Sequence, residues 1–189
     1  MKDLFRGELV RLTSEEPDVR AKHEARWQRD TEFHRLADSD PAELNSEKKI
    51  KEWSEKNAET GFNPARYPFS IRTLDDDKLI GFIGLWLDLI HSEAWIGIGI
   101  GERDYWGKGY GTDAMKLALQ YAFMELGMQR ISLGLLEYNA RALKSYEKAG
   151  FRLEGRTRKD VLREGKRTDT LWMGVLRDEW LQLQGGVKK

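Results

Sequence analysis

The sequence predicts an α+β fold in which a mixed, mostly antiparallel central sheet is flanked by helices. Three observations lead to this class. Short apolar runs separated by turn residues recur in both halves of the chain, which is typical of strands joined by hairpins. Two segments of the second half instead carry apolar residues at helical spacing. One of these segments stands between two predicted strands, which adds a strand–helix–strand unit to the hairpins.

In the first half, turn residues and periodicity give the order of the elements. The acidic turn Asp75–Asp77 lies between two apolar runs and makes them a hairpin. Ile50 and Trp53 fall on one face of an otherwise charged helical segment. The expected elements are a strand at Glu8–Leu12, one or two helices within Asp18–Arg35, a helix at Glu47–Glu59, a loop over 61–68, and strands at Tyr67–Thr73, Leu79–Leu87 and Glu93–Ile100.

In the second half, a glycine follows each helical segment. Gly127 and Gly150 are suited to these positions because glycine readily adopts the left-handed conformation that ends a helix. The turn Glu164-Gly165-Lys166 joins two strands. The expected elements are helices at about Thr112–Leu126 and Asn139–Ala149, and strands at Arg130–Leu136, Phe151–Arg156, Arg158–Arg163 and Thr168–Leu176. No repeat or linker interrupts this order, so we expect one domain over residues 1–189.

The composition excludes several classes of function. The 189-residue chain has 32 Lys and Arg and 32 Asp and Glu, so its net charge is zero and we expect no nucleic-acid partner. The absence of cysteine excludes disulfides, cysteine-ligated zinc and a thiol nucleophile. His23, His34 and His91 are isolated from one another, so we expect no metal site. There is no signal-peptide pattern and no membrane-spanning run, which predicts a cytoplasmic protein without a membrane partner.

The stretch GERDYWGKGYGTDAM, residues 101–115, contains four glycines directly before a predicted helix. Gly107, Gly109 and Gly111 could form no more than a tight strand-to-helix turn. They also come close to the dinucleotide-binding pattern G-x-G-x-x-G, with Glu137 as a ribose ligand. However, the third glycine position holds Thr112, and no second strand–helix–strand unit supports a dinucleotide site.

A third interpretation is a pyrophosphate cradle. The alternating glycines leave backbone N–H groups free to point inward, the helix adds its positive N-terminal end, and Lys108 adds a charge. Gly97 and Gly99 in the preceding strand would let the extended part of the ligand approach the backbone. The spacing of the glycines alone does not decide between these three interpretations.

Two motifs are similar to those of the GNAT superfamily of acyl-CoA N-acyltransferases. The run from Trp106 to Thr112, WGKGYGT, resembles the acetyl-CoA loop, whose pattern is Arg/Gln-x-x-Gly-x-Gly/Ala. Residues 139–151, NARALKSYEKAGF, are similar to the family segment N-x-x-A-x-x-x-Y-E-K-x-G-F. The tail over 154–174 resembles the branch of ribosomal-protein alanine N-acetyltransferases and spermidine N-acetyltransferases. The resemblance covers about residues 6–176, with one departure: Trp106 stands where the wider family has Arg or Gln.

The resemblance implies a GNAT-like fold and transfer of an acetyl group from acetyl-CoA to an amine by direct attack. Backbone N–H groups of the strand before the glycine loop would stabilise the charge on the carbonyl oxygen. The implied acetyl-CoA-binding residues are Ile98, Gly99, Ile100, Trp106, Gly107, Lys108, Gly109, Tyr110, Gly111, Thr112, Asn139, Lys144, Tyr146 and Lys148.

For catalysis, the resemblance implies Tyr146 as the general acid that faces the thioester sulfur, although a core aromatic on a helix stripe has the same spacing. Asn139 matches a residue that contacts the CoA arm, and it is also a good helix N-cap. Glu93, at the start of the strand that lines the acyl site, is our candidate general base. Glu102, His91 and a water relay are weaker alternatives.

The acceptor is expected to be a small-molecule amine or a peptide N-terminus, and the resemblance allows a homodimer. A polyamine would need a carboxylate-lined pocket, for which Asp30, Glu32 and Glu43 are available. Trp86 and Trp95 are the aromatic residues that we expect to line the cleft. A non-catalytic domain that senses CoA is the alternative from another functional class.

Overall fold

A computed structural model describes residues 3–59, 61 and 63–185. Its strands are β1 (Val10–Thr13), β2 (Arg66–Thr73), β3 (Leu79–Asp88), β4 (Glu93–Ile100), β5 (Arg130–Leu136), β6 (Arg152–Arg163) and β7 (Lys166–Leu176). Its helices are α1 (Pro17–Trp27), α2 (Thr31–Ala37), α3 (Glu47–Glu59), α4 (Tyr110–Met124), α5 (Ala140–Ala149) and α6 (Arg177–Gly185), with a short 3₁₀ turn at Arg103–Tyr105.

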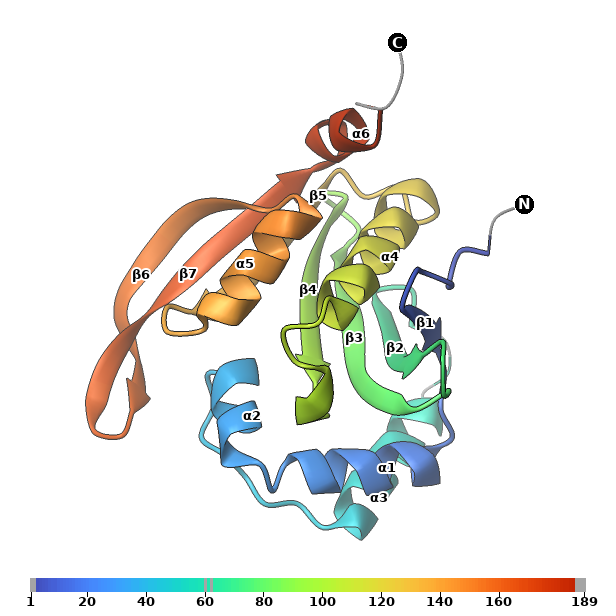
Figure 1. Ribbon diagram of the computed structural model, residues 1–189, viewed down its shortest axis with the longest axis vertical. Helices are drawn as coiled ribbons and strands as arrows, with labels where there is room; N and C mark the ends of the chain where they lie inside the picture. Colours follow the sequence, from blue (N-terminus) through green and yellow to red (C-terminus); the bar gives the residue numbers. More distant parts are fainter. Residues whose placement is uncertain (1–2, 60, 62, 186–189) are drawn as a thin grey trace.

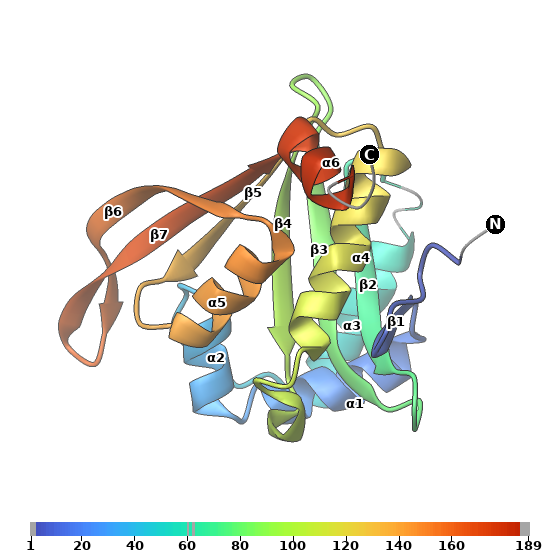
Figure 2. The same ribbon diagram turned by 45° about the horizontal axis from the view of Figure 1, so that its top comes forward.

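The strands form one seven-stranded sheet in the order β1-β2-β3-β4-β5-β7-β6 (Figure 1). Every neighbouring pair is antiparallel except β4 and β5. That parallel pair is short, running only from Glu93 opposite Arg130 to Trp95 opposite Ser132. Beyond Trp95 the two strands diverge, as Figure 2 shows for the green β4 and the neighbouring β5. The predicted mixed sheet with one strand–helix–strand unit, β4-α4-β5, is therefore confirmed.

The helices form layers on the two faces of the sheet. α4 and α5 lie in front of the sheet in Figure 2, and α1, α2 and α3 lie behind its lower end. α4 carries small residues, Ala114, Ala118 and Ala122, that are buried against the sheet and let the helix approach closely. Leu119 and Phe123 are also fully buried, and each such side chain contributes about 1.5–3 kcal/mol by leaving water.

The C-terminal strands differ from the prediction in one respect. We expected two strands with a break before Arg158, but β6 is one long strand. The break is instead an irregularity in the pairing with β7 between Thr157 and Val161, where Lys159 has a positive φ of 55°. The predicted hairpin turn is present, with positive φ at both Glu164 and Gly165, as a tight two-residue hairpin requires.

Two further boundaries differ. α6 was not predicted, because its apolar stripe is short; Trp180 holds it to the core by packing on Phe123 at 5.4 Å between ring centroids. The expected loop over 61–68 ends early, because β2 already begins at Arg66. The remaining predicted helices and strands are confirmed to within a few residues, and Asp18–Arg35 forms parts of two helices.

Candidate active site

The divergence of β4 from β5 leaves unpaired backbone groups on β4. The N–H of Gly101 donates to the carbonyl of Ile80 in β3 at 2.8 Å. Because amides alternate in direction along a strand, the N–H groups of Ile98 and Ile100 point the other way, toward β5. No ladder partner meets them there, since the β4–β5 pairing ends at Trp95. These amides can therefore donate to a ligand in the gap.

The glycine stretch makes the turn into α4 with a left-handed backbone. Gly107 has a φ of 72° and Gly109, the N-cap of α4, has a φ of 95°. Among the residues that the structure describes, no side chain caps this helix. The N–H groups of the first helical turn have no partner within a helix, so they are available, with the positive end of the helix dipole, to bind an anion.

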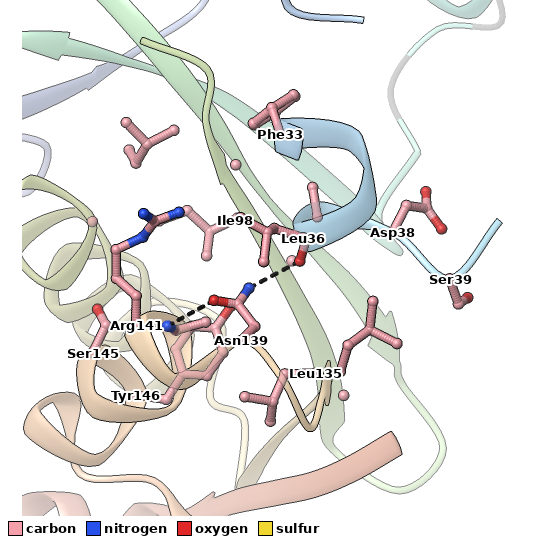
Figure 3. A pocket seen from close by; sticks show the side chains of 18 of the residues that line it. Phe33, Leu36, Asp38, Ser39, Ile98, Leu135, Asn139, Arg141, Ser145 and Tyr146 are labelled. Carbon is pink, nitrogen blue, oxygen red and sulfur yellow. Dashed lines mark hydrogen bonds between the residues drawn. The ribbon is translucent and has the colours of Figure 1, made fainter. Parts of the chain in front are cut away.

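A single cavity of about 1300 Å³ begins at this loop and passes through the gap in the sheet. One end is lined by the loop glycines and by α5, and the other by α2, the segment after it and the β6–β7 hairpin. Figure 3 shows Arg141, Ser145 and Tyr146 on α5 on one side, with Asp38 and Ser39 beyond α2 on the other.

The start of α5 is fixed by Asn139. Its side-chain oxygen accepts from the N–H of Ala142 at 3.1 Å, which confirms it as the N-cap. Its side-chain nitrogen donates to the carbonyl of Leu36 at 3.0 Å, drawn as a dashed line in Figure 3. One buried side chain thus joins α5 to α2. Farther along α5, the hydroxyl of Ser145 lies 2.8 Å from that of Thr112 and joins α5 to the first turn of α4.

Tyr146 lines the cavity one residue after this link. Burial raises the pKa of its phenol to about 12. The side chain is therefore protonated at neutral pH and is able to donate a hydrogen bond or a proton. Its ring also packs 6.1 Å from that of Phe151, between centroids, so the core interpretation of this tyrosine is compatible with the functional one.

Most of the predicted acetyl-CoA-binding residues come together around the cavity. The cavity wall includes Ile98, Gly99, Ile100, Trp106, Gly107, Gly109, Gly111, Thr112, Asn139, Lys144, Tyr146 and Lys148. Lys108 and Tyr110 are not in that wall. Lys108 is exposed, and the ring of Tyr110 packs edge-on against Tyr105 at 5.0 Å between centroids. The lysines that do line the cavity are Lys144 and Lys148 on α5.

The geometry does not support Glu93 as the general base. Glu93 lies outside the cavity wall, at the end of β4 that is still paired with β5. Its carboxylate accepts from Ser132 at 2.7 Å and from Arg130 at 3.2 Å. Glu102 is also placed elsewhere: it accepts from the Trp27 indole at 2.7 Å and pairs with Arg26. Both carboxylates are used in structural contacts that a single sequence does not reveal.

The strand glycines Gly97 and Gly99 lie directly beside aromatic rings. A side chain at Gly99 would come within 2.8 Å of Phe82 and 3.0 Å of Phe33, and one at Gly97 within 3.2 Å of Trp86. These glycines make room for aromatic rings on the sheet face opposite α4, and both also line the cavity. Trp86 itself lies outside the cavity wall, whereas Trp95 is part of it, as predicted.

Several residues of the cavity wall were not predicted from the sequence. They are Arg141 on α5, Asp38 and Asp40 after α2, Asp160 on β6 and Trp172 on β7. Of the carboxylates proposed for the acceptor, Asp30 instead pairs with Arg103 at 2.6 Å. Only tertiary contacts bring these residues together around the cavity. For Trp172 the sequence held a weak indication that it faces away from the core, since it stands between buried residues of β7.

The fit to an elongated, anionic ligand is good at the loop end of the cavity. A free helix N-terminus, positive-φ glycines and two lysines meet there, and the unpaired amides of β4 continue into the gap. Among the described residues, no group of three His, Cys, Asp or Glu is placed to hold a metal ion, and no helix reaches the length and apolarity needed to cross a membrane. Fold and site together define a protein that can bind an elongated ligand carrying phosphate groups.

Comparison with known proteins gives the family. A family model described as "Acetyltransferase (GNAT) domain" matches residues 6–152. The chain belongs to this GNAT acetyltransferase family, whose acyl donor is acetyl-CoA. This assignment replaces the dinucleotide-site alternative for the glycine stretch.

Individual relatives agree. The chain is 37% identical over 113 residues to "Probable N-acetyltransferase YjcK" of Bacillus subtilis (strain 168), covering 58% of this chain and 61% of that protein. It is 29% identical over 113 residues to "Uncharacterized N-acetyltransferase p20" of Bacillus licheniformis, covering 59% and 63%. The chain thus matches about three fifths of the length of these curated relatives.

Among solved structures, the fold is similar to that of a spermidine N-acetyltransferase from Vibrio cholerae in complex with CoA and spermine. The TM-score is 0.78 at 24% identity, and the match covers 91% of this chain and 98% of that one. At this identity the similarity shows the fold.

Proposed function

We propose that this protein transfers the acetyl group of acetyl-CoA to a primary amine by direct attack in a ternary complex. One observation supports the proposal: a single cavity extends from the glycine loop before α4, through the gap between β4 and β5, to a second end lined by α2 and β7. A donor and an acceptor can therefore occupy its two ends and meet in the gap.

The donor would be held by the loop end. The N–H groups at the start of α4 and the loop after Trp106 would bind its phosphates, and the unpaired β4 amides would bind its extended arm. The N–H of Ile98 or Ile100 would also donate to the acetyl carbonyl oxygen, on which negative charge develops during attack.

The chemistry is a substitution at the acetyl carbon. The lone pair of the neutral amine forms a C–N bond, the C–S bond breaks, and the amine nitrogen loses a proton while the sulfur gains one. No enzyme-bound acyl intermediate is needed, which agrees with the absence of cysteine. Tyr146, held as a neutral phenol, is our candidate to donate to the departing sulfur.

For the acceptor, the lining of the second end favours a small cationic amine, such as a diamine or polyamine, over a neutral one. Three carboxylates, Asp38, Asp40 and Asp160, line this end together with the indoles of Trp95 and Trp172 and with one cation, Arg163, which donates to the backbone carbonyls of Asp38 and Asp40. The two indoles are in edge contact, 5.6 Å between centroids. Carboxylates and indole faces both attract ammonium groups. A peptide N-terminus is the other acceptor class that the cavity admits.

The test compares acceptors of equal length that differ in one charge. The rate of free CoA release is measured with acetyl-CoA and either 1-aminopentane, 1,5-diaminopentane or a neutral peptide with an N-terminal alanine, and mass spectrometry identifies the product. We expect kcat/KM for the diamine to exceed that for the monoamine by about tenfold or more, as one charge-assisted contact is worth about 1.5–3 kcal/mol. Equal values for the two amines, or a preference for the peptide, would contradict the cationic acceptor but not the enzyme.

The same experiment distinguishes the enzyme from the alternative, a non-catalytic domain that senses CoA. A protein that binds acetyl-CoA but releases no CoA with any member of a broad amine panel would be a non-catalytic binding domain. The matched variants are Trp95→Leu, at the acceptor end, and Trp86→Leu, on the same sheet face outside the cavity wall. We expect only the first to raise the KM for the amine.

A further inference from the structure

The loop side chain at position 106 is an indole, and an arginine from another element is stacked on it. The guanidinium carbon of Arg141, on α5, lies 3.9 Å from the centroid of the Trp106 ring. In Figure 3 this side chain extends from α5 toward Ile98 of β4. The indole is itself fixed, because its N–H donates to the carbonyl of Ile100 at 2.6 Å. Trp106 therefore presents a fixed aromatic face, directly before Gly107, on which a cation is held.

The neighbouring arginine provides a contrast. Arg103 also lies over the Trp106 ring, with 5.2 Å to the centroid. Its guanidinium is paired with Asp30 at 2.6 Å and with Glu32 at 2.7 Å, and it is not part of the cavity wall. Its charge is thus neutralised by two carboxylates, and its N–H groups are used within the protein.

Arg141 has no such neutralisation. Within the described part of the chain, no carboxylate lies within ion-pair distance of Arg141. Glu32, which acts on its charge from farther away, is held by Arg103. Partial burial and the like charge of Arg103 both lower the pKa of Arg141. A planar cation that is stacked on an aromatic ring by one face and has no counter-ion in a cavity wall is suited to bidentate binding of a phosphate.

We propose that Arg141 is a phosphate-binding residue for the acyl donor, held in place by Trp106. Arg141 places a guanidinium beside the glycine loop, where Trp106 replaces the Arg or Gln of the wider family. The inference rests on the proposed function in taking acetyl-CoA as the donor. The pyrophosphate and the 3′-phosphate of CoA share the relevant chemistry, and the choice between them is part of the test.

The experiment measures dissociation constants by calorimetry for the wild type and for Arg141→Gln, with CoA, 3′-dephospho-CoA and pantetheine as ligands. We expect Arg141→Gln to bind CoA about tenfold to a hundredfold more weakly and pantetheine with unchanged affinity. If Arg141→Gln also binds 3′-dephospho-CoA more weakly than the wild type does, Arg141 contacts the pyrophosphate. If the two proteins bind 3′-dephospho-CoA equally, Arg141 contacts the 3′-phosphate. An unchanged affinity for CoA, or an equal loss for pantetheine, would overturn the proposal.

Two control variants separate this role from a structural one. Arg103→Gln removes the other arginine on the same ring and should leave the affinity for CoA within about twofold. Trp106→Leu removes the stacking face, and adding Arg141→Gln to it should weaken CoA binding little further, because residues that act as a unit are not additive. A wild type that does not bind CoA at all would contradict the proposed function itself, whereas equal binding by wild type and Arg141→Gln contradicts only this inference.

Discussion

At the scale of single residues, Tyr146 is the side chain on which the proposed chemistry depends most. Its phenol lies in the cavity wall, and burial raises its pKa to about 12. A phenol with so high a pKa is protonated throughout the neutral range. Ionisation of Tyr146 should therefore not limit the rate until the pH approaches that value.

The first prediction concerns its removal. Tyr146→Phe should lower kcat by about a hundredfold or more, which is the usual size of a general acid–base contribution, while the KM for acetyl-CoA stays within a few fold. Steady-state rates between pH 7 and 10 are the measurement, and in the wild type we expect no falling limb from this phenol in that range. An unchanged kcat with an unchanged pH profile would make Tyr146 a core aromatic only.

A second residue-scale prediction concerns stability in acid. Arg72 donates to Glu15 at 2.7 Å and lowers the pKa of that carboxyl below its ordinary value near 4.5. A group with a depressed pKa in the folded state stabilises the protein above its unfolded pKa, and this contribution is lost as the pH falls through the folded pKa.

The variant Glu15→Gln should therefore be less stable than the wild type at pH 7, and the difference should shrink as the pH falls below about 4.5. Urea unfolding at several pH values measures it. A difference that is the same at pH 7 and pH 3 would show that the charge of Glu15 is not its cause.

At the scale of elements, two short connections position the site: the glycine turn before α4 and the cap of α5. The turn depends on backbone conformations that only glycine adopts easily. The cap depends on one asparagine that also reaches α2. Both were visible as motifs in the sequence, but the contact of Asn139 with Leu36, about a hundred residues away in the chain, was not.

The glycine turn has a matched control elsewhere in the chain. Gly107 and Gly165 have nearly equal φ values, 72° and 75°, and in both cases open space surrounds the position of a side chain. Gly107→Val and Gly165→Val should both lower the free energy of unfolding, by about 1–2 kcal/mol or more. Only Gly107→Val should also weaken acetyl-CoA binding, by about tenfold, as measured by calorimetry. Equal binding by the two variants would contradict the phosphate-binding role of the turn.

The cap of α5 can be divided into its two hydrogen bonds. Asn139→Ser keeps a capping acceptor but loses the bond to the carbonyl of Leu36, and should cost about 1 kcal/mol of stability. Asn139→Ala loses both bonds and should cost about 2 kcal/mol. Denaturant unfolding measures both. A serine variant as unstable as the alanine variant would mean that the contact with α2, rather than the cap, is the important one.

At the scale of the whole molecule, the chain is organised around the gap where β4 and β5 separate. Periodicity predicted most of the elements that surround it, because strands and helices leave local patterns of apolar residues. The motifs also indicated the donor end. The proposed acceptor end could not be predicted, because Asp38, after α2, is far along the chain from the β6–β7 hairpin that carries Asp160 and Trp172, and only tertiary contacts bring them together. The contacts of Glu93 could not be predicted for the same reason, since its partners Arg130 and Ser132 lie on the next strand of the sheet.

The most direct test of the central claim, that this cavity holds acetyl-CoA, is the thermal unfolding of the protein with acetyl-CoA, CoA, NAD or no ligand. A ligand at about a hundred times its dissociation constant adds roughly 2.7 kcal/mol to the stability of the folded state. For a chain of this size that corresponds to an increase in Tm of about 5–10 °C. We expect such a shift with acetyl-CoA and with CoA, and none with NAD. The absence of a shift with both coenzymes, or a shift with NAD alone, would contradict the claim.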